Sequence, residues 1–218
     1  MGSVSFSIPK EIVLHFAAAL KIPNFVETGT FRGDTALWAA EVFEKVFTIE
    51  IDPELCQKAS QRNNPKNNIS FILGDSKTEL PKLVQTLDGP ALFWLDGHWC
   101  MGGGGKDAEC PLMDELLAIS NLKSSIIMID DARCFLGPLP PPHNSTDWPR
   151  IDEIFQFLKT KLPANRTTLL QDVILSYPPE FSEIFDNYWK ESYITRYNDP
   201  SFTLKRYAKT TLIKNIFK

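Results

Sequence analysis

The sequence predicts a doubly wound α/β domain with a mostly parallel sheet. Strand-like and helix-like segments alternate five times along the first two-thirds of the 218-residue chain. The strand-like runs are continuously apolar, which is typical of strands buried on both faces. Each run also has an acidic residue at or near its end. Units of this length connect parallel strands through right-handed crossovers, so the alternation predicts an open sheet with helices on both faces.

The five expected strands share an apolar body followed by a polar end. They are Asn24–Gly29, Val46–Asp52, Ile69–Asp75, Ala91–Asp96 and Ser125–Asp130. The segments between them have helical spacing, and several open with proline or an N-cap residue. These expected helices are Asp34–Phe43, Pro53–Arg62, Lys77–Leu87 and Pro111–Leu122, and residues 9–20 add an amphipathic helix ahead of the first strand.

The last third of the chain has weaker patterns. A proline-rich loop at 137–142 precedes an expected helix at Pro149–Leu162 and an expected strand at Thr167–Ser176. Phe181–Trp189 reads as helical, and Phe202–Ile213 reads as a final antiparallel strand. Because no repeat, low-complexity tract or long linker interrupts the chain, we expect one domain over residues 1–218.

The composition and charge of the chain narrow the classes of function that it could have. The net charge of −4 disfavours a nucleic-acid partner, and no apolar run is long enough to span a membrane. The basic segment Lys205–Lys218 is either a solvated edge strand or a contact for an anionic acceptor. The scattered cysteines predict a reducing, cytoplasmic setting, and a homo-oligomer is left open. These cysteines are Cys56, Cys100, Cys110 and Cys134.

The turn after the first expected strand carries a glycine pattern that distinguishes between nucleotide ligands. It reads E-T-G-T-F-R-G-D from Glu27 to Asp34. Gly29 permits a tight turn, and Gly33 would let a ligand approach the backbone at the helix start. The middle glycine of the dinucleotide fingerprint G-x-G-x-x-G is missing, which disfavours a pyrophosphate. An acid just before the loop suits a cationic ammonium group, such as that of S-adenosylmethionine.

Two later segments strengthen the prediction of an adenosyl ligand. Glu50 follows Gly29 by 21 residues, at the place where an acid binds ribose hydroxyls. The segment Gly74–Ser76 is placed to meet the adenine edge. The candidate cofactor-binding residues are Glu27, Thr28, Gly29, Thr30, Gly33, Asp34, Glu50, Ile51, Asp75, Ser76 and Asp96.

Carboxylates at the ends of the fourth and fifth strands predict a metal site. These strands are expected to be neighbours, which would bring Asp96, Asp130 and Asp131 together. Three carboxylates repel one another unless a proton or a cation lies among them, and oxygen ligands suit Mg²⁺ or another divalent cation. His98 is a candidate ligand or general base. Alternatively, Asp96 caps a loop and only one residue of the Asp130–Asp131 pair faces the cleft.

Three further features stay open between functional and structural interpretations. The glycine run at 102–105 is either a lid over the acceptor or a flexible loop. Trp99 and Asp172 are candidates for lining the acceptor pocket or for structural roles.

Five segments together resemble a known family: ETGTFRGDT (27–35), TIEID (48–52), GDS (74–76), LDGH (95–98) and IDDA (129–132). The chain resembles class I S-adenosylmethionine-dependent methyltransferases, and among them the metal-dependent macrocin O-methyltransferase type. The resemblance implies a Rossmann-like methyltransferase fold whose seven-stranded sheet ends in an antiparallel hairpin. It also implies cofactor contacts by Glu27, Gly29, Glu50 and Asp75, and Mg²⁺ held by Asp96, Asp130 and Asp131.

The resulting hypothesis is methyl transfer to a hydroxyl of a sugar, a glycan-attached group or a phenolic natural product. A metal would lower the pKa of that hydroxyl, and His98 or Asp96 would accept its proton. The alternatives are a catechol-type O-methyltransferase, a non-catalytic adenosyl-binding module and a nucleotide-dependent oxidoreductase. The segment G-G-G-G-K-D-A-E-C-P (102–111) matches no acceptor-specific pattern, so the sequence leaves the acceptor open.

Overall fold

The computed structural model describes residues 7–99, 105, 109–122 and 124–198. The chain divides into two compact units, Met1–Glu180 and Phe181–Lys218. The first unit contains the whole sheet, and the described part of the second is a helix. The expectation of one domain over the full chain stays a prediction.

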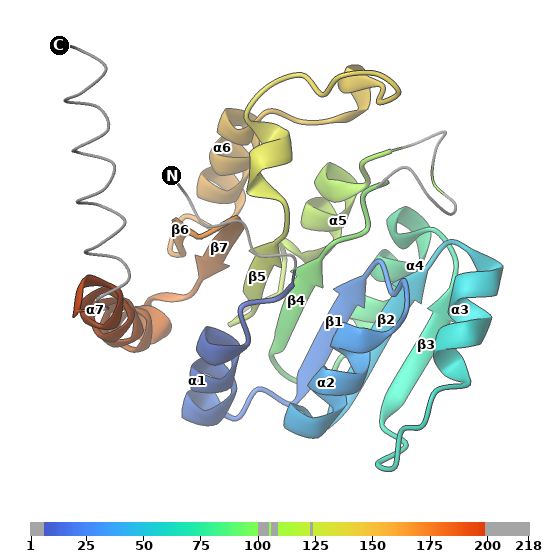
Figure 1. Ribbon diagram of the computed structural model, residues 1–218, viewed down its shortest axis with the longest axis horizontal. Coiled ribbons are helices and arrows are strands. Elements are labelled where there is room, and N and C mark those ends of the chain that lie inside the picture. The colour runs from blue at the N-terminus through green and yellow to red at the C-terminus, as the bar shows by residue number, and fades with distance from the viewer. Residues whose placement is uncertain (1–6, 100–104, 106–108, 123, 199–218) are drawn as a thin grey trace, which may run out of the picture. The chain divides into compact units, whose positions relative to one another are not determined.

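The first unit is built on a seven-stranded sheet with the strand order β3-β2-β1-β4-β5-β7-β6 (Figure 1). The first five strands are parallel, whereas β7 runs antiparallel to both β5 and β6. This topology confirms the predicted doubly wound, mostly parallel sheet. The strands are β1 (Asn24–Thr28), β2 (Lys45–Glu50), β3 (Ile69–Leu73), β4 (Ala91–Leu95), β5 (Ile126–Ile129), β6 (Arg166–Leu170) and β7 (Val173–Tyr177).

Helices cover both faces of the sheet in the first unit (Figure 1). Two of them begin at aspartate caps: Asp52 accepts hydrogen bonds from two backbone N–H groups of α3, and Asp75 accepts one from Lys77 of α4. The helices are α1 (Lys10–Leu20), α2 (Asp34–Val42), α3 (Pro53–Ser60), α4 (Ser76–Leu83), α5 (Leu112–Ile119), α6 (Ile151–Lys161) and, in the second unit, α7 (Ser182–Asn198). No helix in the described part of the chain combines the length and apolar character that a membrane span needs.

The core lies on the central strands. Every residue of β1, β4, β5 and β7 is buried. Helices on both faces exclude water from these strands, which explains why β4 and β5 are continuously apolar.

The predicted strand Thr167–Ser176 is instead two strands, β6 and β7, joined by a tight turn at Gln171 and Asp172. Gln171 adopts the left-handed region with φ 58°, although the turn contains none of the glycine or asparagine residues that normally mark such a reversal. This hairpin supplies the late antiparallel strands that the family resemblance implies. The predicted strand Phe202–Ile213 lies outside the described residues.

Candidate active site

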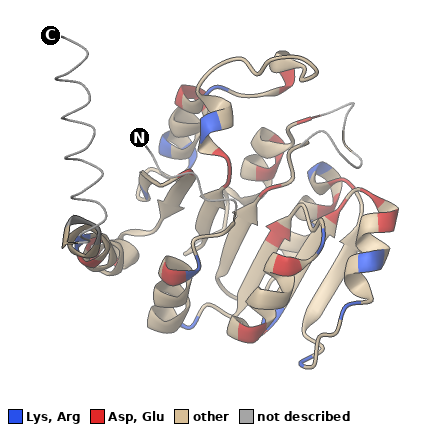
Figure 2. Ribbon diagram, viewed as in Figure 1, with Lys and Arg blue, Asp and Glu red and all other residues tan. Residues whose placement is uncertain are grey.

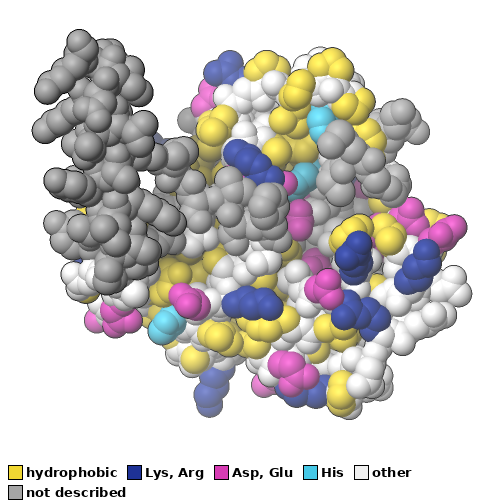
Figure 3. Space-filling view, viewed as in Figure 1, with side chains coloured by type: hydrophobic (Ala, Val, Ile, Leu, Met, Phe, Trp, Pro, Cys, Tyr) yellow, Lys and Arg dark blue, Asp and Glu magenta, His cyan; other side chains and the backbone are white. Residues whose placement is uncertain are grey.

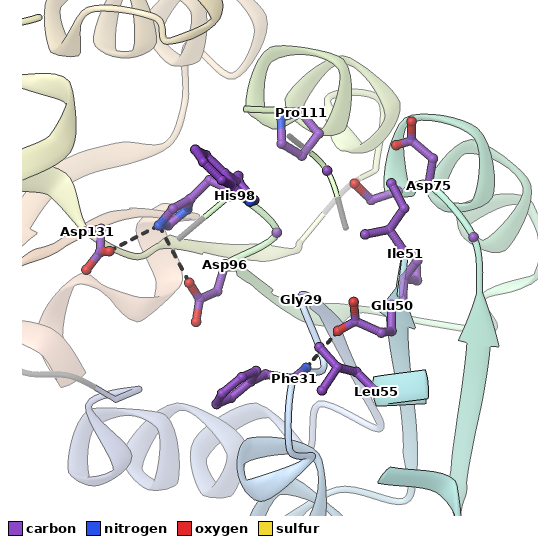
Figure 4. Close-up of a pocket in the computed structure, with 16 residues that line it drawn as sticks. Gly29, Phe31, Glu50, Ile51, Leu55, Asp75, Asp96, His98, Pro111 and Asp131 are labelled. Atoms are coloured by element: carbon purple, nitrogen blue, oxygen red, sulfur yellow. Dashed lines mark hydrogen bonds and ion pairs between the residues drawn. The ribbon is translucent and has the colours of Figure 1, made fainter. Parts of the chain in front are cut away.

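A pocket opens at the carboxyl ends of the parallel strands, and the loops after β1, β2, β3, β4 and β5 all contribute to its wall (Figure 4). It lies where strand order reverses, with β2 on one side of β1 and β4 on the other. The sixteen lining residues are Gly29, Phe31, Ile49, Glu50, Ile51, Leu55, Gly74, Asp75, Ser76, Asp96, Gly97, His98, Trp99, Gly105, Pro111 and Asp131.

The lining is acidic. It contains the carboxylates of Glu50, Asp75, Asp96 and Asp131, and the described lining residues include no lysine or arginine. Figure 2 marks acidic residues at the carboxyl ends of the central strands, and Figure 3 shows acidic and histidine side chains beside one another among apolar ones. The pocket therefore favours a cationic ligand over an anionic one.

The turn after β1 passes very close to the turn after β4. Gly29 has φ 83°, and a Cβ atom at this position would lie 2.8 Å from the carbonyl carbon of Asp96. The backbone N–H of Asp96 donates to the carbonyl of Thr28 at 3.1 Å. Only glycine allows this backbone approach, so Gly29 sets the distance between the two turns.

Glu50 ties the end of β2 to the turn after β1. Its Oε2 accepts a hydrogen bond from the backbone N–H of Phe31 at 2.8 Å, and its Oε1 accepts one from Asp52 at 2.9 Å. The side chain is almost fully buried, yet it lines the pocket. Each carboxylate oxygen has a second lone pair, so Glu50 can also accept hydrogen bonds from a ligand.

Three predicted cofactor contacts lie beneath the pocket rather than in its wall. Glu27, Thr28 and Thr30 are buried and are not lining residues. The hydroxyl of Thr48 donates to Glu27 Oε2 at 2.6 Å and lies 2.6 Å from the hydroxyl of Thr30. Burial raises the pKa of Glu27 to about 8, so its carboxyl group is protonated at neutral pH.

Two further predicted contacts lie outside the pocket wall. A Cβ atom on Gly33 would lie 3.2 Å from Cβ of Ala59, so this glycine permits close packing of α2 on α3 rather than ligand approach. Asp34 is on the surface and pairs with Arg62 at 2.5 Å. Among the sequence-predicted cofactor residues, the pocket wall contains Gly29, Glu50, Ile51, Asp75, Ser76 and Asp96.

His98 lies between two carboxylates at the end of the pocket nearer β5. Its Nε2 is 3.1 Å from Asp131 Oδ2 and 3.8 Å from Asp96 Oδ1 (Figure 4). Burial alone would lower the pKa of His98, but the hydrogen bond with Asp131 and the charge of Asp96 outweigh it and raise the pKa above its usual value. Burial raises the pKa of Asp96 to about 7, with His98 opposing this shift and Asp130 adding to it. The site thus contains acid–base groups suited to neutral pH.

Arg133 supplies the positive charge beside this group. Its Nη1 is 2.7 Å from Asp131 Oδ1, and it also pairs with the carboxylate of Asp172. The backbone N–H of Arg133 donates to Asp172 Oδ1 at 3.0 Å. Asp172 comes from the turn of the β6–β7 hairpin and does not line the pocket, so its contact with Arg133 gives it a structural role.

The predicted metal ligands are not arranged as a metal site. Among the described residues, no three His, Cys, Asp or Glu side chains are placed to hold a metal ion. Asp130 is buried outside the pocket wall, and its Oδ1 accepts a hydrogen bond from the backbone N–H of Asp131 at 2.7 Å. Asp131 is already paired with His98 and Arg133. These residues, as they lie, do not fit a divalent cation, and only one of the aspartate pair faces the cleft.

Sequence reasoning missed several residues of the site. Phe31 and Leu55 line the pocket from the turn after β1 and the first turn of α3, where hydrophobic residues carry no chemical signature. Arg133 was missed although it is only two residues after Asp131, because its partner Asp172 lies 39 residues later. Trp99, a candidate pocket residue, does line the pocket. The glycines at 102–104 lie outside the described residues.

Comparison with known proteins identifies the fold. The TomG O-methyltransferase of Streptomyces achromogenes, solved with SAM, matches with 17% identity over 80% of this chain and 82% of that chain, with a TM-score of 0.51. A Staphylococcus aureus protein assigned as a caffeoyl-CoA O-methyltransferase matches with 12% identity over 81% and 86%, with a TM-score of 0.58. The SAH-bound methyltransferase PaMTH1 of Podospora anserina matches with 20% identity over 79% of both chains, with a TM-score of 0.50.

No protein-family model matches the chain, and no curated protein matches it. At 20% identity or less, these three solved structures establish the fold alone. The chain has the Rossmann-like fold of S-adenosylmethionine-dependent methyltransferases.

Proposed function

We propose that this protein is an S-adenosylmethionine-dependent O-methyltransferase that acts on a hydroxyl of a small polar acceptor. The observation that carries the proposal is the charge of the pocket, with four carboxylates and no lysine or arginine among the described lining residues. A dinucleotide pyrophosphate would be repelled there, whereas the sulfonium and ammonium groups of S-adenosylmethionine would be attracted. Two of the fold neighbours were solved with SAM or SAH bound, which supports the same ligand here.

The cofactor would extend along the ends of β1, β2 and β3. Glu50 would accept hydrogen bonds from the ribose hydroxyls, because its two oxygens are held in place by backbone N–H groups and retain free lone pairs. Asp75 and Ser76 line the pocket beside the start of α4, where they would meet the adenine edge. Gly29 would leave room for the methionine part, since this residue of the pocket wall has no side chain.

The cofactor supplies a methyl group on a positively charged sulfur, and the chain's residues would align the acceptor oxygen and accept its proton. Asp96 suits proton acceptance because its side chain is 37% exposed, lines the pocket and has a pKa raised to about 7. His98 would hold Asp96 in place and stabilise its charge, while Asp131 and Arg133 would fix the imidazole. Sugars, glycan-attached groups and phenolic natural products all present such hydroxyls.

The metal-assisted form of this reaction stays a separate prediction. The pairing of Asp131 with Arg133 and of Asp130 with its own backbone does not favour it. Isothermal titration of Mg²⁺ and Mn²⁺ in the presence of S-adenosylhomocysteine tests it directly. Stoichiometric binding that Asp131→Asn abolishes would restore the metal site, and the proposed reaction would then proceed with a metal.

Isothermal titration of S-adenosylhomocysteine, with NAD as the comparison, tests the cofactor. We expect micromolar binding of S-adenosylhomocysteine and no measurable binding of NAD. The reverse preference would overturn the proposal in favour of an oxidoreductase. Methyl transfer is then assayed with tritium-labelled S-adenosylmethionine and panels of sugars and phenols. Cofactor binding without transfer to any panel member, or to extracts, would favour the non-catalytic adenosyl-binding module.

A further inference from the structure

Glu109 is a buried carboxylate outside the pocket wall, and the functions described so far do not use it. Its Oε2 lies 2.9 Å from His143 Nδ1 and accepts a hydrogen bond from Trp148 Nε1 at 2.8 Å. Its Oε1 accepts one from the backbone N–H of Asn144 at 2.8 Å. Burying a carboxylate is costly unless several donors satisfy it, and here all three donors come from one segment, residues 143–148.

The same residue also holds the loop after β4. The backbone N–H of Trp99 donates to the carbonyl of Glu109 at 2.7 Å. Glu109 is thus bonded to the 143–148 segment through its side chain and to the pocket residue Trp99 through its backbone. These two segments are more than 40 residues apart in the sequence, and neither contains a regular strand or α-helix that would fix its position.

The rings that Glu109 holds are packed against the pocket residues. The Trp148 ring lies 5.3 Å from the imidazole of His98, and the His143 ring lies 5.3 Å from the ring of Trp99, both edge-on. Phe135 completes the set at 5.8 Å from Trp148 and 6.4 Å from His98. Each of the two pocket rings after β4 therefore has an outer ring behind it, and one carboxylate holds both outer rings.

We infer that Glu109 is a positioning residue for the acceptor side of the pocket: it fixes the 143–148 segment and, through Trp148, the ring of His98. The term "acceptor side" rests on the proposed function, but the positioning of His98 does not. Glutamine cannot replace Glu109, because its amide offers one acceptor oxygen and one donor nitrogen to a site that presents three donors. Either orientation of the amide places N–H against N–H and breaks at least one hydrogen bond.

The test measures how fast diethylpyrocarbonate modifies each histidine, with mass spectrometry of the resulting peptides. The side chain of His98 is only 7% exposed in the wild type, whereas His15 is exposed and serves as a reference within the same chain. We expect Glu109→Gln to speed modification of His98 by about tenfold, because the loss of one charged hydrogen bond makes local opening of the structure around His98 about tenfold more frequent. The rate at His15 should stay unchanged. The matched control is Glu41→Gln, which removes an exposed carboxylate paired with Lys66 and should leave both rates unchanged.

A double-mutant cycle separates positioning from general destabilisation. Trp148→Phe keeps a ring behind His98 but removes the donor to Glu109, and it substitutes for Glu109→Gln if that variant does not fold. If Glu109 acts through Trp148, the two substitutions together change the His98 rate less than the product of their separate effects. Purely additive effects, or an unchanged His98 rate in Glu109→Gln, would overturn the inference.

S-adenosylhomocysteine affinity should stay within about twofold of the wild type, since the cofactor residues are at the other end of the pocket. Failure of the wild type to bind this probe would count against the proposed function alone.

Discussion

Substitution of Gly29 tests whether the close approach of two backbone turns builds the pocket. Its φ of 83° lies in the left-handed region, where alanine costs about 1–2 kcal/mol. A Cβ atom would also lie 2.8 Å from the Asp96 carbonyl carbon and 3.2 Å from Gly97 Cα, and backbone atoms cannot move aside as a flexible side chain can. Such overpacking costs about 1–3 kcal/mol more. We therefore expect Gly29→Ala to lose about 2–5 kcal/mol of unfolding free energy and to weaken S-adenosylhomocysteine binding.

Alanine substitutions at two other glycines separate the cost of backbone strain from the cost of atomic crowding. Gly105 has φ 95°, but a Cβ atom there would meet no described atom within 4 Å, so Gly105→Ala should show the strain alone. A Cβ atom on Gly137 would also meet no described atom within 4 Å, and no left-handed φ is found there, so Gly137→Ala should be close to neutral. Urea unfolding gives the free energies, provided that the m-value is the same for each variant. If Gly29→Ala is no more destabilising than Gly105→Ala, backbone crowding is not what demands glycine at this position.

Three further substitutions test buried ionisable groups and their partners. Glu27 has a pKa of about 8 when folded and an ordinary value of 4.5, so the folded state keeps a proton that the unfolded state loses. Stability should fall by up to about 1.4 kcal/mol per pH unit between these values, and Glu27→Gln should remove this slope in denaturant melts recorded from pH 5 to pH 8. Glu50→Gln loses its charge and a backbone hydrogen bond, so calorimetry should show S-adenosylhomocysteine affinity reduced by about tenfold to a hundredfold. Arg133→Met removes the cation beside the buried carboxylate of Asp172 but keeps the backbone N–H that donates to it, and urea unfolding should show a loss of about 2 kcal/mol, since the arginine itself is 37% exposed.

Substitutions of exposed charged residues are the controls for these three substitutions. Glu41→Gln should retain the wild-type pH slope, and Glu54→Gln should retain the wild-type affinity, since Glu54 is exposed and pairs with Lys58 on the surface of α3. Lys45→Met breaks an exposed pair with Asp88 and should cost no more than about 1 kcal/mol. A pH slope that persists in Glu27→Gln would assign the slope to another group. Wild-type affinity in Glu50→Gln would remove Glu50 from the cofactor site, and a neutral Arg133→Met would show that Asp172 is satisfied without it.

The sheet and its pocket could be predicted because their signals are local. Burial on both faces made most residues of the central strands apolar, and the acids at or just after the ends of β2, β3, β4 and β5 led to Glu50, Asp75, Asp96 and Asp131 in the pocket wall. Glu27 shows the limit of this reasoning. Because β1 continues to Thr28, Glu27 is still inside the sheet, where it bonds to Thr48 of β2 instead of reaching the pocket surface.

The missed features depend on partners far away in the sequence. Arg133 pairs with Asp172, and Glu109 binds Trp148, each across 39 residues. Nothing in the sequence near Arg133 indicates whether its guanidinium group faces solvent, lies where a metal ion was expected or pairs with a carboxylate. Likewise, no glycine marks the reversal at Gln171, so the sequence predicts a single strand in place of the two strands of the hairpin. Pattern analysis finds the elements, whereas these contacts depend on how the elements meet in space.

The β6–β7 hairpin also has a consequence for the chain during its synthesis. Strands β1 to β5 can pair while the polypeptide is still emerging from the ribosome, but the far side of β5 gains its partner β7 only after residue 177 has been made. Until then the Ile126–Ile129 strand presents an open apolar edge, the kind that recruits strands from other chains. Asp172 reaches Arg133 in the same event. Closing the sheet and completing the charge network at the pocket are therefore one late step, and a nascent chain stalled before it would lack the Asp172–Arg133 pair and be prone to aggregate.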